Sequence, residues 1–269
     1  MASKSRGWSH LGRFSVGRRV FIGAVEDDSV IETDAECMVD FMAGRASLRE
    51  KRHKLSQLRT LAPVGPPSKI VAVGLNYRSH IGEMHREKSK IPIIFSKPSS
   101  AIIGPEDDIV MPRASKRVDY EGESAIVIGR RAKDVSDGGA YIFGWTCLND
   151  VTARDLQRTD VDWTRAKGFD TFCPLGPYIS RKPPTRVRTL LNGKVVQDAP
   201  TSDRVFGDTA LVEYISTVMT LEPGDVIATG TPSGIGPMRA GDVVEVQLDG
   251  IGSLRNHVIR AERERKAIA

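Results

Sequence analysis

The chain has 269 residues, of which 40% are hydrophobic and 27% are charged, and its formal net charge is +5. These fractions are ordinary for a globular protein. No apolar run approaches the ~20 residues of a membrane helix, and no apolar stretch follows the basic N-terminus as it would in a secretory signal. The sequence therefore predicts a cytoplasmic protein with no membrane partner.

The cysteines and the basic residues exclude two further classes. Cys37, Cys147 and Cys173 are few and widely spaced, and no CxxC pair occurs, so neither a disulfide framework nor a structural zinc is expected. Lys and Arg are densest at Arg45–Arg59 and Arg260–Lys266. No helix-turn-helix, zinc-finger or aromatic stacking motif accompanies them, so we expect solvated faces and no nucleic-acid partner.

The first quarter of the chain predicts a small separate region. Val20–Ala24 and Val30–Ile31 read as two strands joined by a turn. Ala35–Leu61 is rich in helix formers and has apolar residues near helical spacing, which predicts helix. Pro63–Pro67 cannot continue a helix. We therefore expect a small N-terminal region over residues 1–66, followed by a domain over 67–269.

The remainder alternates short β-like runs with Gly and Pro. Asn192-Gly193 between two apolar runs predicts a hairpin, and Thr209–Thr220 predicts a helix with one apolar side. Strands and helices do not alternate regularly, which argues against a doubly wound parallel sheet. The predicted strands are Ile70–Val73, Ile91–Phe95, Ala125–Ile128, Tyr141–Leu148, Val226–Ala228 and Val243–Leu248.

Three carboxylates form a candidate metal site. On a strand beginning at Tyr120, Glu121 and Glu123 point to one face, where their charges repel unless a cation lies between them. Asp150 follows the predicted strand Tyr141–Leu148 and offers a third carboxylate. Oxygen ligands suit Mg²⁺ or Mn²⁺, and the absence of nearby His and Cys argues against zinc. A Glu-x-Glu pair on a solvent face is the alternative.

Several motifs around these residues resemble, in order, those of the fumarylacetoacetate hydrolase family. Any one motif is weak, but together they are highly specific and span roughly Lys69–Val258. The motifs are Gly74–Met84, Phe95–Ser99, Asp119–Glu123, Asn149–Gln157, Lys167–Pro177 and Thr229–Gly236.

The resemblance implies a β-rich α+β fold, with mixed sheets rolled around the active site and a small N-terminal region, in a homodimer. It implies Mg²⁺ or Mn²⁺ bound at Glu121, Glu123 and Asp150, and chemistry on a 2-oxo acid substrate. The family includes acylpyruvases and other diketone hydrolases, decarboxylases, and isomerases such as that of 2-hydroxyhepta-2,4-diene-1,7-dioate.

A candidate general base lies in the first motif. His80 and Glu83 are three residues apart and share a face on a helical turn. His accepts protons near neutral pH, and a carboxylate can orient it and stabilise its charged form. In hydrolytic relatives the matching pair activates water, whereas without the flanking motif it would read as a surface pair.

The resemblance also implies a catalytic Lys167, whose side chain would bind substrate oxygens or a developing enolate. Arg154 and Gln157 share a helix face and are candidates for the substrate's distal polar end, although Arg154 could equally pair with Asp155 or a surface acid. Thr231 lies in a Gly-rich turn that is not a P-loop, and we expect it to contact substrate.

The leading functional hypothesis is a hydrolase that cleaves a C–C bond in acylpyruvate-like 2,4-dioxo acids, with water activated by His80 and Glu83. A decarboxylase or isomerase of β-keto or unsaturated dicarboxylic and tricarboxylic 2-oxo acids uses the same metal site without water attack. A non-catalytic protein stapled by a cation is a third hypothesis, and it predicts metal-dependent stability without turnover.

Overall fold

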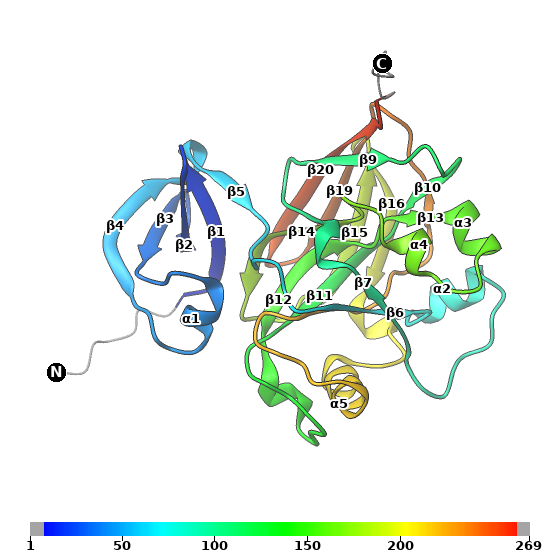
Figure 1. Ribbon diagram of the computed structural model, residues 1–269, viewed down its shortest axis with the longest axis horizontal. Helices are drawn as coiled ribbons and strands as arrows, with labels where there is room; N and C mark the ends of the chain where they lie inside the picture. Colours follow the sequence, from blue (N-terminus) through cyan, green and yellow to red (C-terminus); the bar gives the residue numbers. More distant parts are fainter. Residues whose placement is uncertain (1–7, 263–269) are drawn as a thin grey trace, which may run out of the picture.

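The computed structural model describes residues 8–262, so parts of the basic N-terminal segment and of the charged C-terminal tail lie outside it. Strands dominate and the helices are short, which confirms the β-rich α+β class (Figure 1). No helix in the described part of the chain is long and apolar enough to cross a membrane.

The strands are β1 (His10–Val16), β2 (Arg19–Glu26), β3 (Ser29–Thr33), β4 (Leu48–Lys54), β5 (Arg59–Leu61), β6 (Ile70–Gly74), β7 (Ile93–Lys97), β8 (Ile102–Ile103), β9 (Asp108–Met111), β10 (Val118–Tyr120), β11 (Gly122–Ile128), β12 (Ile142–Asn149), β13 (Thr152–Ala153), β14 (Cys173–Ser180), β15 (Arg186–Leu191), β16 (Lys194–Pro200), β17 (Val226–Ala228), β18 (Gly236–Pro237), β19 (Val243–Leu248) and β20 (Gly252–Arg260). The α-helices are α1 (Met38–Met42), α2 (Arg78–Glu83), α3 (Arg154–Thr159), α4 (Thr164–Lys167) and α5 (Asp208–Val218). Short 3-10 helices occur at η1 (Leu55–Gln57), η2 (Ser99–Ala101), η3 (Gly138–Tyr141) and η4 (Thr201–Asp203).

The strands form mixed sheets. The longest has the order β4-β3-β2-β1-β14-β12-β11-β17-β6-β7, with β5 beside β1 and β8 beside β14. A second sheet has the order β16-β15-β19-β20-β9, and a small one has the order β13-β10-β18. Most neighbours are antiparallel, but three pairs run parallel, namely β17 with β6, β20 with β9 and β14 with β8.

The two large sheets share a core that surrounds β11 and β12. Cys147 on β12 packs in one apolar cluster with Val187, Val246 and Leu254 of the second sheet. Every residue of β11 is buried. The polar side chains at the N-terminal end of β11 therefore lie inside the protein, where an unpaired charge is costly.

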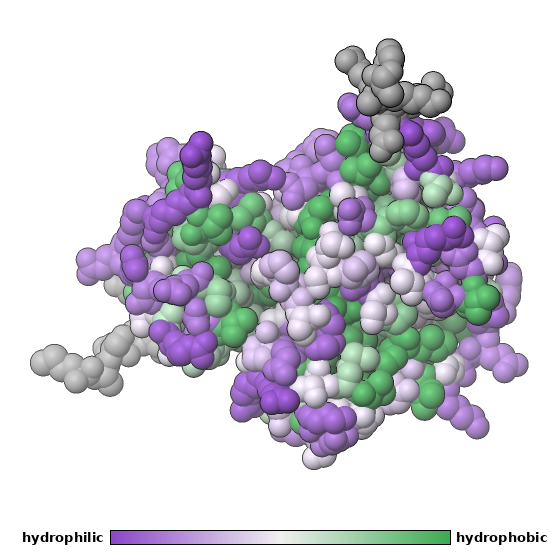
Figure 2. All heavy atoms as spheres, in the orientation of Figure 1, coloured by the Kyte–Doolittle hydropathy of each residue, from purple (hydrophilic) through white to green (hydrophobic). Residues whose placement is uncertain are grey.

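The N-terminal strands are hydrogen-bonded into the rest of the fold. β1 to β4 lie at one end of the molecule (Figure 1), and β1 pairs with β14 through His10 with Ser180 and Leu11 with Ile179. The surface along β4, at the outer edge of this unit, is hydrophilic (Figure 2). Charged side chains on an exposed edge strand discourage pairing with other chains.

Most of the predicted elements are confirmed. The strand pair over Val20–Ala24 and Val30–Ile31 is β2 and β3, and the predicted strands after residue 69 all appear. The hairpin joins β15 to β16, and Asn192 and Gly193 have the positive φ values, 52° and 78°, that its tight turn requires. The predicted helix Thr209–Thr220 is α5.

The helix expected over Ala35–Leu61 is wrong. Only α1 is α-helical there, and β4, η1 and β5 follow it. In β4, Arg49, Lys51 and His53 alternate along the strand, and all three lie within 4.0 Å of Glu32 on β3. Attraction between this buried carboxylate and the alternating basic side chains stabilises a strand here, although the spacing of the leucines favours a helix. This attraction exists only when β3 and β4 are paired.

We expect Glu32→Gln to lower the free energy of unfolding by about 1–3 kcal/mol at pH 6. Burial of Glu32 raises its pKa, but hydrogen bonds from Arg19 and His53 prevail and lower the pKa from 4.5 to about 2. The stabilisation is therefore present above pH 4.5 and is lost as the pH falls towards 2. Urea unfolding at several pH values measures this, with the exposed Glu36→Gln as control. A pH-independent difference between the Glu32 variant and the wild type would contradict it.

Candidate active site

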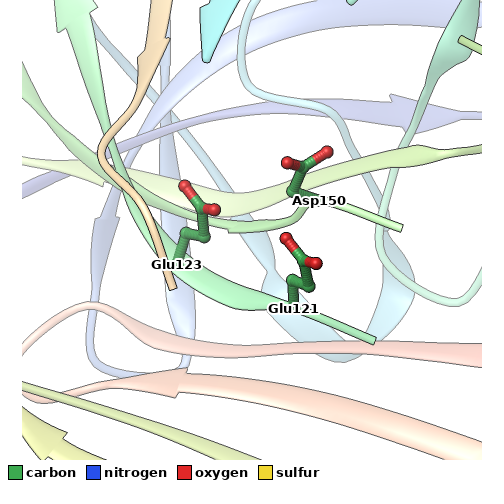
Figure 3. A group of neighbouring side chains, drawn as sticks. All are labelled: Glu121, Glu123 and Asp150. Atoms are coloured by element: carbon green, nitrogen blue, oxygen red, sulfur yellow. The ribbon is translucent and has the colours of Figure 1, made fainter. Parts of the chain in front are cut away.

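The three predicted metal ligands converge. Glu121 lies between β10 and β11, Glu123 lies on β11, and Asp150 directly follows β12. Antiparallel pairing of Gly122 with Asn149 brings both segments together, and Asp150 N–H donates to the carbonyl oxygen of Glu121 at 2.8 Å. Carboxylate oxygens of all three residues lie within 4.8 Å of one another, and the side chains point into one space (Figure 3).

Buried cations also contact these carboxylates. Lys167 Nζ donates to Glu121 Oε2 at 2.8 Å and to Asp150 Oδ2 at 2.6 Å. Arg154 bonds the other oxygen of Glu121. Although burial opposes both shifts, these neighbours lower the pKa of Glu121 and raise the pKa of Lys167, so both groups are charged. Lys97 Nζ lies 2.6 Å from Asp150 Oδ1.

The triad fits a hard divalent cation. Asp150 Oδ1 is buried and accepts no hydrogen bond of good geometry, despite its proximity to Lys97. Burial and repulsion from Asp150 and Glu121 raise the pKa of Glu123 well above its usual range. A cation among these oxygens would remove both penalties, and an all-carboxylate donor set suits Mg²⁺ or Mn²⁺.

The cluster is neutral when all of its acidic and basic side chains are ionised. Asp119 is also buried, and it bonds both Arg117 and Arg154. Four acidic side chains thus face four basic ones. The acids are Asp119, Glu121, Glu123 and Asp150, and the bases are Lys97, Arg117, Arg154 and Lys167. A divalent cation would leave two positive charges, which favours an anionic ligand beside it.

The predicted general base His80 and its partner Glu83 both lie on α2. His80 Nδ1 lies 2.9 Å from Glu83 Oε2, and His80 is only 6% exposed. Glu83 Oε1 accepts from the backbone N–H of Gly234 at 3.0 Å, and the carbonyl oxygen of Gly234 accepts from Tyr120 Oη at 3.0 Å. With Nδ1–H donated to Glu83, Nε2 of His80 is the nitrogen that can take a proton.

The residues predicted to contact substrate differ in their hydrogen-bond partners. Arg154 pairs with neither Asp155 nor a surface acid, because its nitrogens bond Asp119, Glu121 and Gln157. Thr231 Oγ1 donates to the carbonyl oxygen of Gly122 at 3.0 Å and accepts from a glutamine amide. One lone pair of this hydroxyl remains for a ligand. The roles of Arg154, Gln157 and Thr231 towards substrate stay predictions.

One cavity of about 860 Å³ unites these groups, a volume typical of small-molecule sites. Its lining includes the triad and the other predicted site residues His80, Lys167, Arg154, Gln157 and Thr231. Apolar side chains form much of its wall. They are Val73, Leu75, Met84, Ile93, Phe95 and Trp163.

Sequence reasoning assigned no role to Lys97 or Asp119, although both stand in the motifs. Lys97 is fully buried, and its Nζ also donates to the carbonyl oxygen of Lys167 at 2.6 Å. Asp119 holds the guanidinium of Arg154. The only available signal was their place inside the motifs, since charged residues read as exposed until the pairing of distant strands is known.

Comparisons with known proteins identify the family of this chain. A family model described as "Fumarylacetoacetate (FAA) hydrolase C-terminal" matches residues 69–259. A mitochondrial oxaloacetate tautomerase of Rattus norvegicus is 42% identical over 220 residues, which cover 76% of this chain and 70% of the relative.

Two solved structures match almost the whole chain. A 5-carboxymethyl-2-hydroxymuconate delta-isomerase from Mycobacterium smegmatis has 43% identity and a TM-score of 0.84, covering 94% of this chain and 100% of that one. A maleylpyruvate hydrolase from Sphingobium sp. SYK-6, in complex with manganese(II) and pyruvate, has 30% identity and a TM-score of 0.78 with the same coverage. The chain belongs to the fumarylacetoacetate hydrolase family.

Proposed function

We propose that the protein is a divalent-cation-dependent hydrolase that cleaves a C–C bond in acylpyruvate-like 2,4-dioxo acids. The supporting observation is that one cavity is lined by both the carboxylate triad and His80, whose Nδ1 lies 2.9 Å from Glu83 Oε2. The manganese and pyruvate of the maleylpyruvate hydrolase complex also support it, because pyruvate is the product expected from an acylpyruvate.

Mg²⁺ or Mn²⁺ held by Glu121, Glu123 and Asp150 would supply Lewis acidity, which stabilises negative charge on the oxygens of a 2-oxo acid. Lys167 contacts two of these carboxylates and is positioned to donate to an oxygen of the substrate. The balanced charges of the cluster predict that cation and anionic substrate bind cooperatively, since each offsets the charge of the other.

His80 would act as the general base. Its Nε2 takes a proton from water as the water oxygen attacks the acyl carbonyl carbon. The C–C bond to the pyruvate carbon then breaks, and its electron pair leaves with pyruvate as the enolate, which regains a proton at carbon. Glu83 accepts from Nδ1, so it orients the imidazole and stabilises its charged form.

The second candidate is an isomerase or tautomerase of a 2-oxo diacid. Sequence identity favours it, because relatives with these activities in their names are 42–43% identical whereas the hydrolase is 30% identical. His80 would then move a proton between carbon and oxygen with no water attack. Decarboxylation of a β-keto acid would draw on the same stabilised enolate.

A substrate panel with Mg²⁺ or Mn²⁺ tests the proposal. It contains acetylpyruvate, fumarylpyruvate and oxaloacetate, and it follows pyruvate release, enol absorbance and CO₂ in parallel, with EDTA as control. Cation-dependent pyruvate release from the acylpyruvates would establish the hydrolase. Faster loss of enol oxaloacetate without pyruvate would assign tautomerisation instead, and CO₂ release without acyl cleavage would assign a decarboxylase.

We expect Tyr120→Phe to lower kcat about 3- to 10-fold, the effect of one lost hydrogen bond. The phenol oxygen holds the carbonyl of Gly234, whose N–H fixes Glu83, so the substitution loosens the orientation of His80. Steady-state kinetics should show a change in kcat with KM and Mn²⁺ affinity retained. The control is Tyr214→Phe on α5, and equal kcat for both variants would contradict this positioning role.

A further inference from the structure

A buried glutamine of the second sheet supports the active site from behind. Gln197 lies on β16, and its amide uses all of its hydrogen-bonding capacity. Its Oε1 accepts from the backbone N–H of Gly122 at 3.0 Å and from Thr189 Oγ1 at 2.7 Å. Its Nε2 donates to Thr231 Oγ1 and to the carbonyl oxygen of Pro232, both at 2.9 Å. The proposed chemistry uses none of these contacts.

Two backbone groups decide which way this amide points. The N–H of Gly122 can only donate, so the oxygen of the Gln197 amide must face it. The carbonyl oxygen of Pro232 can only accept, so the nitrogen of the amide must face it. The reversed amide would place donor against donor and acceptor against acceptor. The hydroxyl of Thr231, which lies on the nitrogen side, therefore receives a hydrogen from Gln197.

Side chains satisfy the buried backbone of Gly122 where the neighbouring strands do not. Gly122 pairs with Asn149 on β12. The adjacent hydrogen bond, from Asp150 N–H to the carbonyl oxygen of Glu121, makes this a non-hydrogen-bonded pair, so the N–H and C=O of Gly122 point away from β12. On that other side, β17 pairs with β11 at Ala125–Val127 and does not reach Gly122.

The hydroxyl of Thr231 retains only an acceptor for a ligand. It donates its hydrogen to the carbonyl oxygen of Gly122 at 3.0 Å, and withdrawing this hydrogen would leave a buried carbonyl unpaired. It receives a hydrogen from Gln197, so one lone pair remains. Thr231 lines the same cavity as the triad. A hydrogen-bond donor can meet this lone pair favourably, whereas the oxygen of a carboxylate or ketone is repelled by it.

We propose that Gln197 is a positioning residue that fixes Thr231 as an acceptor, so that the cavity selects a ligand hydroxyl there over a carboxylate or ketone oxygen. The inference rests on the proposed function for the class of ligand, because the enol form of a 2-oxo acid carries such a hydroxyl on the carbon beside its carboxylate. Gly122 stands between Glu121 and Glu123 in the chain, so the hydroxyl bonded to it lies beside the triad. The proposed function places the 2-oxygen of the substrate beside the same triad.

Binding of matched ligands tests the inference without turnover. Isothermal titration of the Mg²⁺-loaded protein gives its affinities for the two enantiomers of lactate, which has a hydroxyl on its second carbon, and for pyruvate, which has a ketone there. The ratio of lactate affinity to pyruvate affinity cancels any loss that both ligands share. We expect Thr231→Val to lower this ratio about 5- to 10-fold for the tighter enantiomer, the effect of one hydrogen bond, and Thr231→Ser to retain it.

The same ratio reports on Gln197. We expect Gln197→Met to lower the ratio about 2- to 5-fold, because methionine keeps the length of the side chain but no longer holds the oxygen of Thr231. In the Thr231→Val background the same substitution should leave the ratio unchanged, since Gln197 acts through Thr231. Gln247→Met is the control and should keep the wild-type ratio, because Gln247 lies on β19 and lines a different surface depression.

The outcomes separate this inference from the proposed function. A wild-type ratio in Thr231→Val would show that the hydroxyl accepts nothing from the ligand, and it would overturn the inference. Equal weakening of both ligands in Gln197→Met would give Gln197 a merely structural role and would overturn it too. Either result leaves the hydrolase standing, since the triad and His80 are unchanged. If the wild type binds neither ligand with Mg²⁺, the 2-oxo acid site itself is wrong and the inference fails with it. The two Thr231 variants decide the acceptor role even if Gln197→Met does not fold.

Discussion

Glu123→Gln is expected to lower kcat/KM by about 10³-fold or more on every 2-oxo acid that the protein converts. Glutamine keeps the shape of the side chain and an oxygen that can accept from the N–H of Gly230, now 2.7 Å from Glu123 Oε2. It removes one negative charge from the triad, so the cation is held weakly. Steady-state kinetics, together with electron paramagnetic resonance of free Mn²⁺, measure both effects.

Thermal unfolding of the same variant separates a lost cation site from a damaged fold. In EDTA we expect its Tm to equal or exceed that of the wild type, because the neutral glutamine removes the burial and repulsion that raise the pKa of Glu123. In Mg²⁺ the wild-type Tm should rise by mass action while that of the variant stays constant. Glu222→Gln, at a half-exposed ion pair with Arg131, is the control. Unchanged Mn²⁺ affinity in Glu123→Gln would refute the triad as the cation site.

His80→Ala should slow hydrolysis of an acylpyruvate by about 10²- to 10⁴-fold, the usual contribution of a general base. Mn²⁺ affinity should be retained, because His80 bonds Glu83 and is not one of the three residues that would bind the cation. Glu83→Gln should have a smaller effect than His80→Ala, since it leaves the imidazole in place but weakens its orientation. Single-turnover kinetics with acetylpyruvate and fumarylpyruvate measure the chemical step.

The control for His80 is His257→Ala, a substitution on β20 away from the cavity. If His80→Ala hydrolyses both acylpyruvates at the wild-type rate, water is activated elsewhere and the proposed mechanism is wrong. If hydrolysis is absent in the wild type while enol oxaloacetate converts rapidly, the same variant reports whether His80 moves the proton in tautomerisation.

The predictions from sequence succeeded where a local pattern decides the structure. Alternation along the extended backbone from Glu121 into β11 places Glu121 and Glu123 on one side, and Asn192-Gly193 fixes its hairpin through two positive φ values. The site also required Asp150 to lie beside Glu121, and the order of family motifs supplied that long-range information. No local pattern carries it, since β11 and β12 meet only through pairing.

Predictions failed where tertiary contacts override a local preference. The spacing of the leucines in Ala35–Leu61 suggested a helix, but ion pairs between the buried carboxylate of Glu32 and the basic side chains of β4 stabilise a strand. The sequence did not indicate a role for Lys97, because its partners are the carboxylate of Asp150 and the carbonyl oxygen of Lys167, both distant in sequence. A charged residue buried among remote partners has the same local signature as one in solvent.

The position of β14 in the longest sheet has a consequence for the order of folding during synthesis. β1, β2 and β3 can pair with one another as soon as they are synthesised. The pairing of β1 with β14 can form only after residue 180, the partner of residue 10, has been synthesised. Likewise β6 finds its parallel partner only when residues 226–228 emerge. Pairings of such high contact order form slowly. We therefore expect the hairpins of β1, β2 and β3 to form during synthesis, before the strands that surround the active site have all paired.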